Sequence, residues 1–459
     1  MIASSIKRFL EKENIDFQVV EHEEHGSLYQ AAQAADIPLR QVARTVVIGN
    51  SVATFMAILP ASHLLDFKVL SDQLKSELNP KSADDLQGFF NDCEPGCRPP
   101  FPALYKMQGL VDAAEFKDDF VYLEPGTHQC FIRVARSDFM HILTGAEDMA
   151  MSCPPENLQF DSEDAIEESL NSFTPKRIKQ RIDETFDLPA LPDIASEILR
   201  LRVNPAAEAK DLADIVSKDP SLAAQVISWA SSPYYGYQGD VTSVEVAISR
   251  VLGFDLVMNL VLGIAIGKSL SIPDDGPLGL SNFWRQSVYC AAFSERICTL
   301  IPAKNRPQRG LVYLSGLLHN FGHLLLSHLF PPQFFIINRY VETNSAFPVE
   351  TIERHVLGVT HEEMGAWLLR SWNMPEEITY AIRHHHNPSY TGTHSEYANI
   401  IMIANCMLKR LAIGDGYLVD PPAPMLKELG IEQTDIENLF EKLVDRSEEL
   451  DMMTKQMVA

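Results

Sequence analysis

The pattern of apolar residues changes once along the chain, between residues 143 and 176. Before this interval, short β-type runs such as VARTVVIG and FVYLEP alternate with helical ones. After it, β-type alternation disappears and helix-start signals recur. A chain of 459 residues also exceeds the usual size of one domain. The change therefore predicts a multidomain protein, with an N-terminal α/β (α+β) domain followed by an all-α domain.

An acidic stretch fills the interval between the two patterns. No lysine or arginine occurs between Arg136 and Lys176, while Asp and Glu gather around Pro154 and Pro155. Such a stretch is typical of a linker between domains. We therefore predict a first domain over residues 1–146, an acidic linker over 147–175, a helical domain over 176–415 and a helical tail over 416–459.

Helix-start signals in the second half consist of a capping side chain followed by a proline or, three positions on, by an acidic residue. They occur at Asp219 with Pro220, Thr242 with Glu245, and Thr434 with Glu437. Gly253 is suited to close the helix that Thr242 would start. The most apolar run, Val251–Ile266, contains polar residues and is too short to cross a bilayer. It is predicted to be a buried helix.

The net charge and the cysteines indicate which partners and which cellular compartment to expect. The formal net charge of −24 opposes broad nucleic-acid binding, so any nucleic-acid contact must be local. The seven cysteines are scattered, and a chain of this length does not need disulfides to fold. The N-terminus is an amphipathic helix without a secretory signal. We expect a cytoplasmic protein with reduced thiols and no membrane partner.

Four segments of the first half resemble the YbaK family of aminoacyl-tRNA editing domains. They are VARTVVIG, MAILPASHLLDF, the loop CEPGCRPPF and the later run FVYLEPGTHQCFIRVARSDF. The resemblance covers residues 15–143. It implies hydrolysis of a mischarged aminoacyl ester without a metal or a protein nucleophile. In that family a lysine on an early strand and a Gly-x-x-x-Pro loop position the substrate.

The loop of this family is matched from Gly96 to Pro100, but the lysine position holds Arg44. An arginine keeps the positive charge and replaces a compact ammonium with a planar fork. The resemblance thus implies substrate-positioning roles for these residues and tRNA as a candidate partner, and leaves deacylation open. Alternatively, Arg44 is a strand arginine that pairs with an acid such as Asp66. Cys93 and Cys97 flank the loop but lack the second ligand pair of a closed zinc site.

The second half resembles the HDOD family over residues 188–410. The matching segments include DLPALPDIASEILRL, LADIVSKDPSLAAQVISWASSPYYG, GLLHNFGHLL and HEEMGAWLLRSWNMPEEITYAIRHHHNP. HDOD domains belong to the HD superfamily, whose active members hold divalent metals with a histidine, a later His-Asp pair and a distant aspartate. Such ligands bind an ion that generates hydroxide and neutralises a phosphate under attack.

The HD metal positions are largely replaced in this chain. The resemblance places Gln286 at the first histidine, His319 and Asn320 at the pair, and Asn405 at the distant aspartate. Each aspartate-to-asparagine change removes a negative charge that would hold a dication. We therefore predict a neutral polar core, with no metal and no cofactor.

A second group of histidines leaves an alternative open. His361, His385 and His386 match positions that some active HD enzymes use for a second metal. His319 and His323 also lie four residues apart, on one helical face. These side chains predict either a residual histidine-only metal site or a set of cleft-lining and helix-capping groups.

The resemblances together predict a bacterial signal-transduction or regulatory protein. Its HDOD module would be non-catalytic, and its partner would be a signalling protein or a small ligand. One alternative is an aminoacyl-tRNA deacylase that the helical half regulates. Another is a metal-dependent phosphodiesterase with an unusual histidine site.

Overall fold

The computed structural model describes residues 2–22, 28–50, 52–76, 78–81, 85–86, 88–154, 191–268, 270, 272–274, 276–344, 347–416 and 420–458. The chain divides into two compact units. The first contains residues 1–159 and 339–347, and the second contains residues 160–338 and 348–459. The division is not linear in sequence, because a short segment from the helical half belongs to the first unit.

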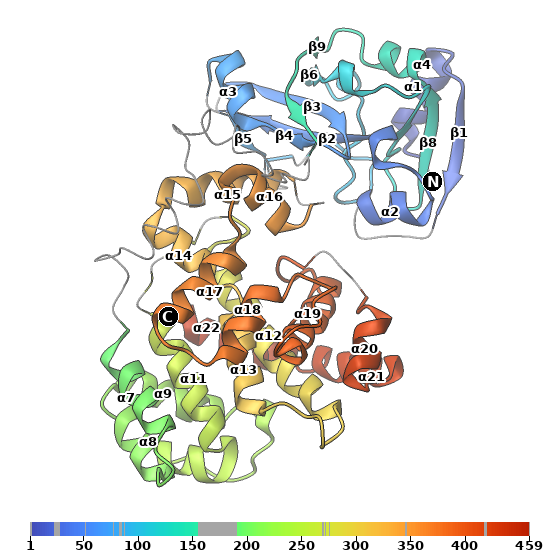
Figure 1. Ribbon diagram of the computed structural model, residues 1–459. Coiled ribbons are helices and arrows are strands. Elements are labelled where there is room, and N and C mark those ends of the chain that lie inside the picture. The colour runs from blue at the N-terminus through green and yellow to red at the C-terminus, as the bar shows by residue number, and fades with distance from the viewer. Residues whose placement is uncertain are drawn as a thin grey trace. The chain divides into compact units, whose positions relative to one another are not determined.

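The first unit is built on one mixed β-sheet (Figure 1). The strands follow the order β1-β8-β7-β2-β3-β6-β9, and β5 pairs with β2. A separate two-stranded sheet joins β10 to β4. The strands are β1 (Phe17–Glu21), β2 (Val42–Gly49), β3 (Thr54–Pro60), β4 (Leu64–Leu65), β5 (Asn79–Pro80), β6 (Gln108–Val111), β7 (Phe120–Leu123), β8 (Cys130–Ala135), β9 (Glu147–Asp148) and β10 (Ser152–Cys153).

Strands β2 and β3 form the centre of this sheet and are buried along almost their whole length. They pair antiparallel from Ala43 opposite Pro60 to Gly49 opposite Thr54. Burial on both faces accounts for their continuous apolar runs. The helical elements of this unit are α1 (Ser4–Lys12), α2 (Leu28–Ala34), η1 (Leu39–Gln41), α3 (Phe67–Leu74), η2 (Ala113–Glu115) and α4 (Arg136–Ile142).

Strands β9 and β10 extend the first unit beyond residue 146. Glu147 and Asp148 pair with β6, and Ser152 and Cys153 pair with β4. The beginning of the expected 147–175 linker is therefore part of the first unit's sheets. Residues 155–175 of that linker lie outside the described residues.

The second unit is helical throughout its described elements (Figure 1). Its long helix α12, which holds Gln286, contacts α13 and α19, and α19 holds Asn405. The elements are α7 (Asp193–Arg202), α8 (Ala209–Val216), α9 (Pro220–Ala230), η4 (Pro233–Tyr235), α10 (Val244–Val246), η5 (Ala247–Leu252), α11 (Phe254–Gly267), α12 (Leu280–Leu300), α13 (Arg309–Leu318), α14 (Phe321–Leu329), α15 (Pro331–Thr343, ending in the first unit), α16 (Val349–Leu357), α17 (His361–Ser371), α18 (Glu376–His384), α19 (Ser395–Arg410), α20 (Ala423–Leu429), α21 (Gln433–Val444) and α22 (Ser447–Val458).

One of the three predicted helix starts is confirmed as it stands. The Asp219 side chain accepts hydrogen bonds from the backbone N–H groups of Ser221 and Leu222 at the start of α9, and Pro220 is the first helical residue. The start predicted at Thr242 is one residue early, because Ser243 is the capping side chain of α10. The start predicted at Thr434 is wrong. Helix α21 already begins at Gln433, so Thr434 lies in its first turn.

Helix α11 confirms the prediction of a buried apolar helix, because its residues from Leu256 to Gly267 are all buried. In the described part of the chain, we find no helix with the length and apolar character needed to cross a membrane. None of the seven cysteines takes part in a disulfide, and five of them are buried.

Candidate functional site

Arg44 lies on the central strand β2 and is only 7% exposed. Its Nη1 donates to the carbonyl oxygen of Thr343 at 2.9 Å. Its Nη2 donates to the carbonyl oxygen of His63 at 3.0 Å and to Oδ1 of Asn344 at 2.8 Å. All of these residues belong to the first unit. The arginine fork is therefore occupied by three neutral oxygens.

The charge of Arg44 has no carboxylate partner among these hydrogen bonds. Burial lowers the pKa of its guanidinium to about 10, which still leaves it protonated at neutral pH. Its Nε is buried and makes no hydrogen bond within the described residues. Oδ1 of Asp66 accepts from Val69 and from Tyr340. The alternative of an ion pair between Arg44 and Asp66 is thus not found among these contacts.

The loop from Gly96 to Pro100 is anchored by contacts of its own. Gly96 has a φ of +93°, a conformation that favours glycine. The backbone N–H of Arg98 donates to Oε2 of Glu124 at 3.0 Å. Among the described atoms, no hydrogen bond joins this loop to Arg44. The structure therefore places Arg44 and the loop in one unit without linking them directly.

The buried thiol of Cys97 has neighbours that its sequence spacing did not reveal. Its Sγ lies 3.6 Å from ring nitrogens of His128, and ligand atoms of Glu94, Cys97 and His128 lie within 4.8 Å of one another. The Glu94 carboxylate, however, already accepts from the Thr127 hydroxyl and the His128 backbone N–H. Burial also raises the pKa of Cys97, which disfavours the thiolate that binds metals.

In the second unit, two of the four HD-type positions donate hydrogen bonds to one carboxylate, Asp415, and a third lies beside them. Gln286 on α12 donates its Nε2 hydrogen to Oδ1 of Asp415. Asn320, between α13 and α14, donates from Nδ2 to Oδ2 of the same carboxylate at 3.1 Å. His319 lies beside them, with its Nε2 3.3 Å from Nε2 of Gln286.

The polarity of this group is the reverse of a metal cage. In a metal cage, ligand oxygens and nitrogens point lone pairs at a cation. Here two amides point N–H groups at an anion, the Asp415 carboxylate. The set formed by Gln286, Asn320 and Asp415 therefore does not fit a divalent ion in this arrangement. The predicted neutral core is instead an anion surrounded by donors.

The asparagines at two of the HD-type positions also have unused hydrogen-bonding capacity. Both amide atoms of Asn405, on α19, are buried and make no hydrogen bond within the described residues. The same is true of Oδ1 of Asn320. Buried polar groups without partners are uncommon in proteins and invite an explanation. These two positions therefore keep unused hydrogen-bonding capacity inside the domain.

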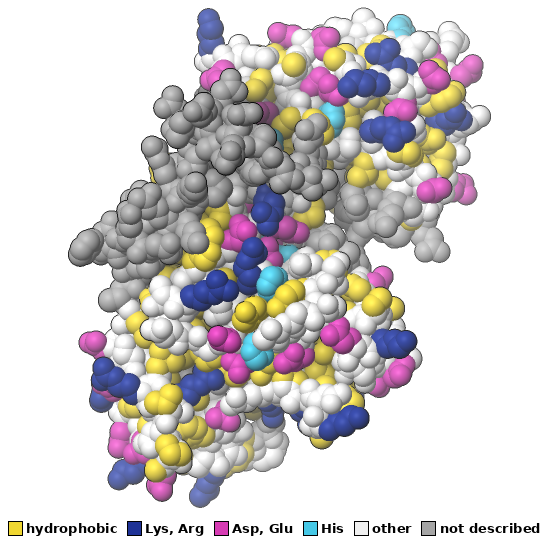
Figure 2. Space-filling model, viewed as in Figure 1, with side chains coloured by type: hydrophobic (Ala, Val, Ile, Leu, Met, Phe, Trp, Pro, Cys, Tyr) yellow, Lys and Arg dark blue, Asp and Glu magenta, His cyan; other side chains and the backbone are white. Residues whose placement is uncertain are grey.

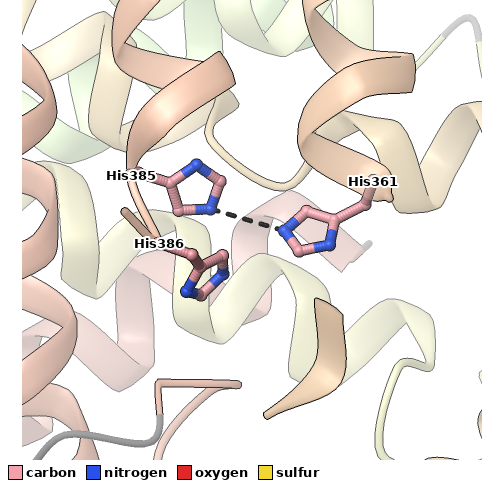
Figure 3. A group of neighbouring side chains, drawn as sticks. All are labelled: His361, His385 and His386. Atoms are coloured by element: carbon pink, nitrogen blue, oxygen red, sulfur yellow. Dashed lines mark hydrogen bonds between the residues drawn. The ribbon is translucent and has the colours of Figure 1, made fainter. Parts of the chain in front are cut away.

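The second group of histidines does converge, as Figure 3 shows. His361 begins α17, while His385 and His386 follow the end of α18. Their ligand nitrogens lie within 4.8 Å of one another, and Nε2 of His361 is 3.4 Å from Nε2 of His385. Oδ2 of Asp415 lies 3.8 Å from Nε2 of His361 and 3.5 Å from Nε2 of His386.

Two of the three histidine rings, those of His361 and His385, are each oriented by an acceptor that lies near Nδ1. Nδ1 of His361 is 2.8 Å from Oε2 of Glu353, and Nδ1 of His385 is 2.7 Å from the carbonyl oxygen of Ile382. Because both partners are acceptors, each Nδ1 carries a hydrogen. In their neutral forms, both imidazoles would then point Nε2 lone pairs at each other. A cation, either a proton or a metal ion, is needed between them.

This histidine set therefore fits one metal ion by its chemistry. Histidines held from behind by a carboxylate or a carbonyl are typical of metal sites. His361, His385 and His386 would hold the ion, with Asp415 as a candidate fourth ligand. A bound ion would supply Lewis acidity at this point.

Protonation provides the same positive charge without a metal. Burial opposes a charge on His386, but Glu350 and Asp415 outweigh it and raise its pKa to about 10. Burial likewise opposes a charge on His361, and Glu353 outweighs it and raises that pKa. Burial disfavours ionised Glu353, yet His361 and His323 lower its pKa to about 2. The raised pKa values of His361 and His386 thus favour their protonated forms beside the carboxylates of Glu353 and Asp415.

Sequence reasoning missed both of these carboxylates. Asp415 stands between Gly414 and Gly416. A Cβ atom at Gly414, where φ is +82°, would collide with the Gln286 amide, and one at Gly416 would crowd Asn405. These two glycines are the only signal that the chain approaches the site here. Nothing in the residues around Glu353, on α16, indicated that this carboxylate belongs to the site.

Comparisons with known proteins agree with both halves of the structure. The HDOD domain matches residues 188–388, and the aminoacyl-tRNA editing domain matches residues 22–142. A Marinobacter aquaeolei VT8 protein provisionally assigned to signal transduction is 32% identical, with 99% of each chain covered and a TM-score of 0.84.

Two further relatives match only part of the chain. An HDOD domain protein of unknown function from Geobacter sulfurreducens is 22% identical over 61% of this chain and 97% of its own, with a TM-score of 0.51. An uncharacterised Treponema pallidum protein is 27% identical over 53% of this chain, a match that spans only 46% of that relative. The full-length similarity and the two domain matches together show that this chain belongs to the HDOD family and carries an aminoacyl-tRNA editing domain ahead of its HDOD domain.

Proposed function

We propose that this protein is a cytoplasmic bacterial signal-transduction protein whose HDOD domain binds a ligand or a partner and does not hydrolyse phosphodiesters. The observation that supports this proposal is the Asp415 carboxylate, which accepts N–H groups from Gln286 and Asn320. Metal-dependent hydrolysis needs a dication that activates water and neutralises phosphate. The Asp415 carboxylate is negatively charged and is already held by amide N–H groups, so it does not provide the positive charge that would neutralise a phosphate.

The unused amide groups favour binding as the role of this region. Asn405 and Oδ1 of Asn320 are buried and offer both a donor and acceptors. A small polar ligand that satisfied them would recover the free energy lost by burying them unpaired, about 1–3 kcal/mol for each group. Such a ligand would bind the native state only, and would therefore raise the melting temperature.

Metal analysis tests this proposal directly. We expect the purified protein to contain no stoichiometric iron, manganese or zinc, and its melting temperature to stay unchanged after treatment with a chelator. We also expect no hydrolysis of a cyclic dinucleotide, with or without added Mn²⁺. Stoichiometric metal together with cyclic-dinucleotide hydrolysis that stops on adding chelator would contradict the proposal and favour a phosphodiesterase.

A second candidate function is aminoacyl-tRNA deacylation by the first unit. The observation that favours it is the protonated side chain of Arg44, which lies where the editing family has its lysine and has no carboxylate among its hydrogen-bond partners. On the face drawn in Figure 2, however, Lys and Arg side chains of the described residues are interspersed with acidic and apolar ones. A tRNA contact would thus rest on local groups.

A panel of mischarged tRNAs tests this second function, with the Arg44→Lys variant as the comparison. If the substitution of the family lysine has disabled the domain, the wild type should be nearly inactive and Arg44→Lys should deacylate faster. Fast deacylation by the wild type that falls in the lysine variant would instead establish an editing enzyme that uses arginine.

A further inference from the structure

Residues 339–347 are the only part of the helical half that the division assigns to the first unit. Its described residues are the last residues of α15, Arg339–Thr343, together with Asn344 and Phe347. Arg339 donates to the carbonyl oxygen of Leu78 and to Oδ1 of Asn79. The hydroxyl of Tyr340 donates to Oδ1 of Asp66 at 3.2 Å, and its ring meets that of Phe67 edge-on at 5.9 Å.

Asn344 is the central contact of the segment, and its side chain is fully buried. Its Oδ1 accepts from Nη2 of Arg44 at 2.8 Å and from the backbone N–H of Leu65 at 3.1 Å. The preceding residue, Thr343, gives its carbonyl oxygen to Nη1 of Arg44. Two consecutive residues of the segment therefore occupy both terminal nitrogens of the arginine.

The same segment also acts on the Gly96–Pro100 loop. Burial lowers the pKa of Arg98 in that loop, and the charges of Glu124 and Glu342 act against this effect. Arg98 in turn acts on the carboxylate of Glu342. Glu342 directly precedes Thr343. Thr343 and Asn344 thus contact Arg44 directly, and the charge of the preceding residue, Glu342, acts on Arg98 of the loop.

We propose that residues 339–347 are an internal inhibitor of the editing domain, in which the Thr343 carbonyl and the Asn344 amide occupy the Arg44 contacts that an aminoacyl ester would use. The two oxygens resemble those of an ester chemically, because each is a neutral sp² acceptor presented to a guanidinium. The inference rests on the first unit being an editing-type binding domain, whether or not that domain still hydrolyses its ligand.

A ligand can displace the segment because the segment offers Arg44 neutral oxygens and no negative charge. A buried guanidinium without an anionic partner has lost hydration that neutral oxygens do not fully replace. The 3′ end of a tRNA carries phosphates beside its ester, and charge-assisted hydrogen bonds to phosphate are stronger than those to neutral carbonyls. Such a ligand would therefore form stronger hydrogen bonds with Arg44 than the segment does.

Chain continuity connects the segment to the histidine cluster of the second unit. The segment ends at Phe347, and α16 begins at Val349. Glu353 on α16 accepts from Nε2 of His323 at 2.8 Å and from the backbone N–H of His361 at 2.9 Å. The helix that directly follows the segment therefore contributes Glu353 to the histidine cluster.

The test weakens the segment and measures two properties of the full-length chain. The release variant combines Asn344→Ala with Tyr340→Phe, which removes two hydrogen-bonding groups of the segment and leaves Arg44 intact. The matched control combines Asn282→Ala with Tyr237→Phe in the second unit. The first measurement is the modification of Arg44 by phenylglyoxal, followed by peptide mass spectrometry. The second is binding of a non-hydrolysable 3′-aminoacylamino-3′-deoxyadenosine and of tRNA that carries this end.

We expect Arg44 to be modified at least about tenfold faster in the release variant, and the tRNA probe to bind about tenfold more tightly, because a closed state lowers apparent affinity by the fraction of molecules that are open. The control should behave as the wild type. Two results would overturn the proposal: Arg44 that stays protected in the release variant, or Arg44 that becomes reactive without any gain in binding. The nucleoside probe shows whether the ester end alone accounts for the gain.

Deacylation measured on the same proteins separates this inference from the editing function. Tighter binding without turnover supports the inhibitory segment and rejects a working deacylase. Equal binding and equal turnover in wild type and release variant would reject the inhibitory segment and leave a deacylase in place.

Discussion

The two units treat a buried charge in opposite ways. In the first unit, the guanidinium of Arg44 is held by three neutral oxygens, and none of its hydrogen bonds ends on a carboxylate. In the second unit, the imidazoles of His361 and His386 lie beside the carboxylates of Glu353 and Asp415. Both regions contain residues that differ from the catalytic pattern of their families. Only in the second unit do the described contacts pair these positively charged side chains with carboxylates.

This difference suggests that the two sites have different roles. A buried charge that is paired and hydrogen-bonded makes a stable polar core, whereas an unpaired one keeps a free-energy incentive to bind an external anion. We therefore expect the histidine cluster to behave as a rigid part of the HDOD domain, and the Arg44 site to behave as a binding site that is closed by its own chain.

The largest effect is expected from Glu353→Gln. The substitution keeps the shape of the side chain but removes the charge that faces His361 and His323. Removing one partner of a buried ion pair lowers the free energy of unfolding by about 3–5 kcal/mol. Chemical denaturation of the helical unit measures this loss.

Glu441→Gln on α21 is the matched control, because Glu441 is exposed. We expect it to change the free energy of unfolding by less than about 0.5 kcal/mol. A loss below about 1 kcal/mol in Glu353→Gln would show that the buried cluster is not ionised, and would remove the contrast between the two units.

A smaller effect is expected when the HD-type ligands are restored. The combined change of Gln286→His, Asn320→Asp and Asn405→Asp places new carboxylates beside Asp415, and like charges at such distances need a cation between them. Mn²⁺ at a hundred times its dissociation constant should stabilise this variant by about 2.7 kcal/mol. Thermal unfolding with and without Mn²⁺ measures the shift.

The wild-type chain is the control for this experiment and should not respond to Mn²⁺. If the wild type is stabilised as strongly as the variant, the group formed by His361, His385 and His386 holds a metal in its native form. The charge balance inferred for the second unit would then depend on that ion rather than on protons.

The smallest effect is expected from Arg44→Met. Methionine fills a similar volume, and the lost hydrogen bonds are offset by no longer burying a charge without an anionic partner. The desolvation cost of the buried guanidinium disappears together with its hydrogen bonds, so the free energy of unfolding of the first unit should fall by about 1 kcal/mol or less. Denaturation monitored on the first unit measures it, and Arg40→Met, at an exposed ion pair, provides the control.

A loss of more than about 3 kcal/mol in Arg44→Met would contradict the comparison, because losses of that size follow the breaking of a compensated buried pair. Arg44 would then be a structural residue of the same kind as Glu353. The inhibitory segment would remain bound for reasons of packing rather than as a substitute for a ligand.

The sequence by itself determined the two folds and the residues at the family positions. The change from β-type alternation to helical periodicity depends on neighbouring residues, so it is visible without a structure. The turn at Pro125 and Gly126 follows from local preferences in the same way, and it lies between the antiparallel strands β7 and β8. The replacements at Gln286, Asn320 and Asn405 are read directly from the residue types.

Only the tertiary structure decided what those residues contact. Asp415 reaches Gln286 and Asn320 from positions 129 and 95 residues away, and Asn344 reaches Arg44 from 300 residues away. No local periodicity encodes such pairs, because a hydrogen bond or an ion pair depends on distance in space and not on distance along the chain. For the same physical reason, the assignment of residues 339–347 to the first unit emerged only when the packing of both halves was known.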